Sequence, residues 1–104
     1  MEAITIYITC PNLESAQQIG RAMVEQRLAA CANILEGMRS IYWWEGALAE
    51  DQEVVLLLKT RATFGERLKA AVKQLHPYEV PCIVAWPIVM AEESYLSWIK
   101  QETK

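Results

Sequence analysis

Residues 53–59 read EVVLLLK, five consecutive aliphatic residues between a glutamate and a lysine. A run of this length is typical of a β-strand. Successive side chains of a strand point to opposite faces, so three of the five face one way and two, Val55 and Leu57, the other. An antiparallel strand with one face in water should alternate apolar and polar residues. The run therefore predicts a sheet that is covered on both faces.

Upstream of this run, the sequence predicts a strand, a helix and a second strand. Residues 3–9 alternate isoleucine with threonine and tyrosine, which is the pattern of a half-buried strand. Asn12 is suited to cap a helix whose apolar residues recur at helical spacing over about 13–28. A second strand is expected from about Ala30 to Ile34, and Gly37 then indicates a bulge or bend. The strand resumes at Ile41 and ends over residues 43–45, before a turn at Gly46.

Downstream, the order of elements repeats. Thr63 and Glu66 have the spacing of a capping box, and the amphipathic helix that they open should end before Pro77. A fourth strand is expected over 82–89, and a short closing helix from Glu92.

Strand, helix and strand thus occur twice, with similar spacing from Ile4 to Cys31 and from Val54 to Cys82. This repetition predicts one α+β domain over residues 1–104 with the split βαβ (βαββαβ) arrangement. Its four-stranded antiparallel sheet would carry both long helices on one face, with a short C-terminal helix added.

The other face of that sheet needs a cover. Adjacent Trp43 and Trp44 must point to opposite faces, so at least one indole lies away from the helices. Leaving it in water forgoes roughly 2–3 kcal/mol of burial. The closing helix is too narrow to cover four strands, so we expect association of identical subunits.

Composition excludes several classes of partner. The formal net charge is −3 at pH 7, without a basic run, which argues against nucleic acid. The apolar stretches are too short to span a membrane, and the first residues do not resemble a secretory signal. Three widely spaced cysteines without a C-x-x-C motif indicate reduced thiols. The expected location is cytoplasmic.

The predicted topology places five reactive side chains at one edge of the sheet. They come from the end of the first strand, the end of the second helix and the start of the fourth strand: Cys10, His76, Tyr78, Glu79 and Cys82. Two thiols and an imidazole suit copper or Zn²⁺. The alternative is that the cysteines only pack in the core and His76 only interacts with the helix dipole.

Cys31 and Lys59 belong to the opposite edge, where only an oligomer could bring them to a neighbour's site. Lys59 is suited either to an anionic ligand or to simple exposure in solvent. Glu45 and Glu79 are candidate acids, bases or metal ligands, although solvated carboxylates are common at turns. Without a nucleophile–base pair or a phosphate loop, we do not expect an enzyme.

Five segments, read together, resemble a known family. They are RLAACANI (27–34), SIYWWEG (40–46), EVVLLLKT (53–60), HPYEVP (76–81) and YLSWI (95–99). Their order and separations resemble those of the CutA family, the divalent-cation-tolerance proteins. The resemblance implies a ferredoxin-like subunit in a tight homotrimer, similar in architecture to the PII signalling proteins. It also implies a role in tolerance to divalent metals, copper chiefly, with copper binding in some members and no established reaction.

The resemblance further implies a cleft between subunits, built from Cys31, Trp44, Glu45, Lys59, His76, Tyr78 and Glu79. This chain departs from the family pattern at Cys82, where a glutamate is usual, and at Cys10. Both changes add thiols and would shift a metal site toward softer ions.

Two functions follow as hypotheses. The first is a metal-binding trimer involved in metal tolerance, which the thiols and His76 favour. The second is a PII-like regulatory trimer that binds a small anionic metabolite in the cleft, which Lys59, Trp44 and Tyr78 favour.

Overall fold

The computed structural model describes residues 2–104 and shows four strands and three α-helices in the expected order, together with one 3₁₀ turn. The elements are β1 (Ala3–Cys10), α1 (Leu13–Glu25), β2 (Cys31–Trp44), β3 (Ala47–Arg61), a 3₁₀ turn (Ala62–Phe64), α2 (Gly65–Leu75), β4 (Ile83–Ile88) and α3 (Glu93–Glu102).

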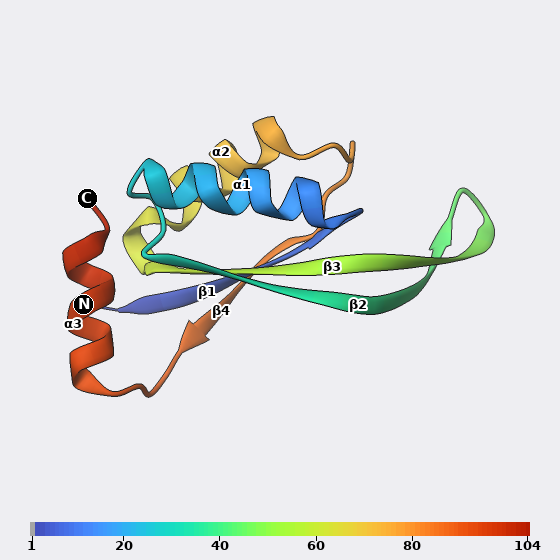
Figure 1. Cartoon of the computed structure of the whole chain (residues 1–104). Helices are drawn as coiled ribbons and strands as arrows, with labels where there is room; N and C mark the ends of the chain where they lie inside the picture. The colour runs from blue at the N-terminus through green and yellow to red at the C-terminus, as the bar shows by residue number, and fades with distance from the viewer. Residues whose placement is uncertain (1) are drawn as a thin grey trace.

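The strands form one sheet in the order β2-β3-β1-β4, and every pair of neighbours is antiparallel. Helices α1 and α2 lie on the same face of this sheet (Figure 1). This is the ferredoxin-like split βαβ fold, so the fold predicted from the sequence is confirmed. No helix within residues 2–104 is long and apolar enough to cross a membrane.

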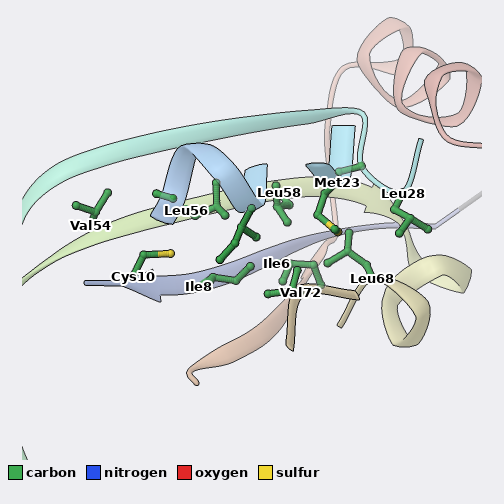
Figure 2. Close-up of a cluster of buried hydrophobic side chains, with 13 residues drawn as sticks. Ile6, Ile8, Cys10, Met23, Leu28, Val54, Leu56, Leu58, Leu68 and Val72 are labelled. Atoms are coloured by element: carbon green, nitrogen blue, oxygen red, sulfur yellow. The ribbon is translucent and has the colours of Figure 1, made fainter. Parts of the chain in front are cut away.

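The core lies between the sheet and the two long helices. Alternate residues of β1 and β3 point into it, with Ile8, Leu56 and Leu58 fully buried. Helix α2 contributes Leu68 and Val72, and Figure 2 shows these side chains converging from the different elements. The apolar residues that alternate along the strands and those that recur along the helices thus pack together in one core layer.

Of the two side-chain helix caps predicted from the sequence, one is confirmed and one is wrong. The Asn12 side chain accepts a hydrogen bond from the Ser15 backbone N–H at 2.8 Å, as an N-cap should. The expected capping box at Thr63 and Glu66 does not form. A 3₁₀ turn occupies that position, and α2 begins at Gly65 without a side-chain cap.

Strands β2 and β3 form a hairpin that extends well beyond the helices (Figure 1). The expected irregularity at Gly37 is present as a break in pairing between Leu35 and Met38. Glu45 and Gly46 form the tip with φ angles of 50° and 79°, the left-handed conformation of a tight two-residue hairpin turn. The molecule is consequently elongated, with principal extents of 45 × 25 × 22 Å.

Helix α3 packs at one end of the sheet, opposite the hairpin tip (Figure 1). Its Ile99 is buried against Ala3 and Ala30. Away from this end, the face of the sheet opposite α1 and α2 exposes large apolar side chains, including Leu35 (57% exposed) and Trp86 (48% exposed). One short helix therefore leaves much of this face uncovered in the single chain.

Candidate functional site

A hollow of about 730 Å³ opens beside the hairpin, on the side of the sheet away from α1 and α2. Strands β1, β2 and β3 contribute to its wall, together with residues 77–80 that follow α2 and Cys82 that precedes β4. Beyond the break in pairing around Gly37, β2 and β3 pair regularly again toward the hairpin tip. Met38 is paired with Glu53, and Ser40 with Asp51.

Two tyrosine–carboxylate hydrogen bonds organise the wall of the hollow. The Tyr78 hydroxyl donates to Glu53 Oε2 at 2.8 Å, and the Tyr42 hydroxyl donates to Asp51. Burial, followed by the Glu53 carboxylate, raises the pKa of Tyr78, and the Asp51 hydrogen bond is the main cause of the raised pKa of Tyr42. Both phenols therefore stay protonated at neutral pH and remain donors.

Four residues singled out in the sequence meet in this hollow: Trp44, Tyr78, Glu79 and Cys82. Glu45 does not line it, because it occupies the exposed hairpin tip next to Trp44.

His76 lies beneath the hollow and is 7% exposed. Its Nδ1 accepts a hydrogen bond from the Tyr78 backbone N–H at 3.1 Å, and its Nε2 is 2.8 Å from the Thr9 carbonyl oxygen. Since Nδ1 accepts, Nε2 carries the proton and donates to Thr9. Both ring nitrogens are thus used to hold the segment after α2 against β1, and neither offers a lone pair to a metal in this arrangement.

Cys10 and Cys82 lie at the same edge of the sheet but on opposite faces. Cys10 is in the core with 0% exposure, in line with Ile8 and Ile6 of β1 (Figure 2). Burial raises the pKa of its thiol to about 11. Cys82 lines the hollow on the other face. The expected edge is correct, but the two thiols do not converge within one subunit.

Cys31 and Lys59 are paired across β2 and β3 at the far end of the same face. Lys59 Nζ donates to Asn33 Oδ1 at 2.5 Å, and the Cys31 Sγ lies 3.6 Å from the Tyr95 hydroxyl of α3. Burial and then the Cys31 contact raise the pKa of Tyr95 to about 12. As the topology predicts, these residues are not part of the hollow in the same subunit.

Within residues 2–104, no three histidine, cysteine, aspartate or glutamate side chains are grouped closely enough to hold a metal ion. A structural or catalytic metal site takes at least three protein ligands. A metal site made from the candidate ligands would therefore need residues from more than one subunit.

The sequence reasoning missed six polar residues of the hollow: Tyr7, Thr9, Ser40, Tyr42, Asp51 and Glu53. The aliphatic run predicts a strand over 53–59, whereas β3 begins six residues earlier at Ala47. A signal was available in the alternation backward from Val55, which places Glu53 and Asp51 on the face of Tyr7. Assigning Tyr42 to the same face also requires knowing where the bulge interrupts the alternation of β2.

The fold and this site define a class of protein: a small ferredoxin-like α+β domain with an extended hairpin and an open hollow of aromatic and acidic side chains. Residues 4–102 match the model of the CutA1 divalent ion tolerance protein family. The chain belongs to this family, which confirms the resemblance seen in the sequence.

Individual relatives are similar along the whole chain. The divalent-cation tolerance protein CutA of Thermus thermophilus is 50% identical over 103 residues, covering 99% of both chains. The CutA protein of Pyrococcus horikoshii is 46% identical, covering 97% of this chain and 98% of its own. The crystal structure of CutA1 from Oryza sativa has a TM-score of 0.97 at 38% identity, covering 100% of this chain and 95% of that one.

Proposed function

We propose that the protein is a homotrimeric divalent-ion tolerance protein that binds copper or another divalent metal ion in a cleft between subunits. One observation carries the metal-binding part. The polar wall of the hollow contains three carboxylates and a thiol, from Asp51, Glu53, Glu79 and Cys82, and no lysine or arginine among its lining residues. Such a wall attracts cations and repels anions.

The donors least committed to other contacts are Glu79 and Cys82. Asp51 and Glu53 already accept tyrosine hydrogen bonds, and both nitrogens of His76 are occupied. Two donors from one subunit leave a metal site incomplete. In an oligomer, a neighbour's far edge would supply Cys31 as the third donor, and thiolates favour copper or zinc over harder ions.

The PII-like alternative, a small anionic metabolite, receives less support from the geometry. Lys59 is its main cation, and it lies at the end of β3 away from the hollow, where it donates to Asn33. That alternative remains a prediction, as do the cytoplasmic location and the absence of enzymatic activity.

The test is native mass spectrometry of freshly purified protein, followed by competition titrations with Cu(I) and Zn²⁺. We expect trimers that carry metal removable by a chelator. Cys82→Ser and Cys31→Ser should each weaken metal affinity by roughly tenfold or more, which corresponds to about 1.4 kcal/mol.

Cys10→Ala is the matched control, because its thiol is buried on the other face of the sheet and should leave metal affinity unchanged. Metal affinities that are equal in the wild type and in the Cys82 and Cys31 variants would contradict the site. A bound organic anion in the purified trimer would support the alternative.

A further inference from the structure

His76 joins two parts of the chain through one imidazole ring. It follows the last residue of α2 and is buried. Its Nε2 donates to the Thr9 carbonyl oxygen at 2.8 Å, and its Nδ1 accepts the Tyr78 backbone N–H at 3.1 Å. Strand β4 begins at Ile83, opposite Ile8, so the Thr9 carbonyl lies one residue beyond the last pair of these strands. The imidazole therefore supplies the hydrogen bond that a strand neighbour would otherwise give to this carbonyl.

The segment after His76 depends on side chains for its position. Residues 77–80 form no helix or strand, and no backbone group of theirs is hydrogen-bonded to another backbone group within residues 2–104. Because Pro77 has no N–H, Tyr78 carries the first N–H of the segment. This N–H is bound to the imidazole, and the Tyr78 hydroxyl is bound to Glu53. Two hydrogen bonds to side chains, one from its backbone and one from its hydroxyl, thus fix Tyr78.

The bond from the Tyr78 backbone can exist only while the imidazole is neutral. A neutral imidazole has one donor and one acceptor, whereas an imidazolium ion has two donors. A second proton, on Nδ1, would place an N–H of the ring against the N–H of Tyr78. The Nε2–H bond to the Thr9 carbonyl survives protonation and becomes charge-assisted. Protonation therefore breaks one of the two hydrogen bonds of the ring and keeps the other.

Histidine is the side chain that ordinarily changes its charge between pH 5 and pH 8, and this chain has one histidine. Burial raises the pKa of the Cys10 thiol to about 11 and also raises the pKa of Tyr78, whose ring centroid lies 4.9 Å from that of His76. Both groups therefore stay protonated throughout this range. The further titratable side chains at this end of the surrounding elements are Tyr7 of β1, Glu14 of α1, Glu53 of β3, Lys73 of α2, and Glu79 and Cys82 of the segment after His76.

We infer that His76 is a pH-sensitive clasp. Its neutral ring holds the Tyr78 backbone to β1, and the proton taken up on acidification opens the turn over residues 76–78 while the ring stays on Thr9. Tyr78 also lines the hollow and donates to Glu53, so the opening of this turn changes one wall of the hollow. The inference holds whether or not a metal ion binds, because neither ring nitrogen offers a lone pair to a metal in the clasped form.

Nuclear magnetic resonance of the metal-free, full-length protein, labelled with nitrogen-15, tests the clasp between pH 7.5 and pH 5.5. The ring signals belong to one residue, since the chain has a single histidine. At pH 7.5 we expect the Nε2–H tautomer and a Tyr78 amide that is protected from hydrogen exchange. As the ring takes up its proton, the protection factor of this amide should fall by about fivefold or more, which is the effect of losing one hydrogen bond.

The Ser15 amide is the internal control for this measurement. It is also bound to a side chain, at 2.8 Å, but its acceptor, Asn12 Oδ1, is an amide oxygen that does not titrate. Its protection factor should stay the same over the pH range. An imidazolium ring beside an equally protected Tyr78 amide, or a ring that is still neutral at pH 5.5, would overturn the inference.

His76→Asn separates the effect of the imidazole from that of the nearby carboxylates. An asparagine side chain can accept the backbone N–H two residues further on, and it does not titrate. The protection of the Tyr78 amide in this variant should therefore be independent of pH, and a fall equal to that in the wild type would assign the effect to other groups. The variant gives up the Thr9 bond, so circular dichroism establishes that it is folded. If it does not fold, the ring and amide signals of the wild type decide alone.

Discussion

At the scale of single residues, the three cysteines differ in environment more than their sequence positions indicate. Cys10 is enclosed by the core, Cys82 lines the hollow, and Cys31 touches Tyr95 at the far end of the sheet. Alternation along β1 places Cys10 on the same face as Ile8, so this placement was available from the sequence. The presence of a hollow around Cys82 was not, because residues of four other segments form it.

The buried thiol of Cys10 predicts a loss of stability at alkaline pH. Its pKa is raised from 9.0 to about 11, chiefly by burial and secondarily by the Glu53 carboxylate. The unfolded chain therefore releases this proton first. The contribution of this thiol to the free energy of unfolding is fully present below about pH 9 and falls as the pH rises toward 11. Above pH 11 it levels off, after a total loss of about 2–3 kcal/mol per subunit.

Urea unfolding of wild type and Cys10→Ala between pH 8 and pH 11 tests this, at one protein concentration. The other titrating groups are common to both proteins, so the difference in the free energy of unfolding isolates the thiol. The advantage of wild type over the variant should shrink as the pH rises. A difference that stays constant with pH would contradict the assignment.

At the scale of elements, removal of a side-chain oxygen should destabilise the start of α1 and have almost no effect at the start of α2. Asn12→Ala removes the acceptor of the Ser15 N–H and should lower stability by about 1 kcal/mol. Asn12→Asp should retain the acceptor and therefore the stability of the wild type. Thr63→Ala is expected to be nearly neutral, because Thr63 lies in the 3₁₀ turn ahead of α2 and makes no capping bond. Thermal unfolding of the three variants measures this, and equal losses in Asn12→Ala and Thr63→Ala would mean that the starts are wrongly assigned.

The elements themselves were largely predictable, because their apolar periods are strong. The alternation in β1 fits a strand, and the short length of the aliphatic run in β3 favours a strand over a helix. The misplaced capping box shows the limit of local motifs: Thr63 and Glu66 have the right spacing, but the chain leaves β3 through a 3₁₀ turn that shifts the helix start to Gly65. The extension of β3 back to Ala47 was missed since cross-strand pairing, rather than propensity, holds that part of the hairpin.

At the scale of the whole molecule, the hollow is a product of topology. It forms where the hairpin passes the segment after α2, and His76 holds that segment to Thr9 of β1. The sequence predicts that His76, Tyr78 and Cys82 share an edge, which is correct. It does not reveal that Asp51 and Glu53 face them, because this depends on the strand start and on a bulge at Gly37.

The uncovered sheet face leads to the last prediction, which concerns assembly. Trp86 is 48% exposed on this face and stacks on Tyr7, with ring centroids 4.9 Å apart. If identical subunits cover this face, each subunit buries an indole there, which contributes roughly 2–3 kcal/mol. Trp86→Glu would instead place a charge in each buried copy, so the trimer dissociation constant should rise by about a hundredfold or more.

Sedimentation velocity over a dilution series measures this effect. Gln17→Glu is the matched control, since it adds the same charge at an exposed position on α1, away from the uncovered face. A folded monomeric wild type in dilute solution would remove the argument for a trimer. A Trp86→Glu protein that sediments as the wild type does would show that the subunits associate through another surface, and the cleft proposed for the metal would then have to be built elsewhere.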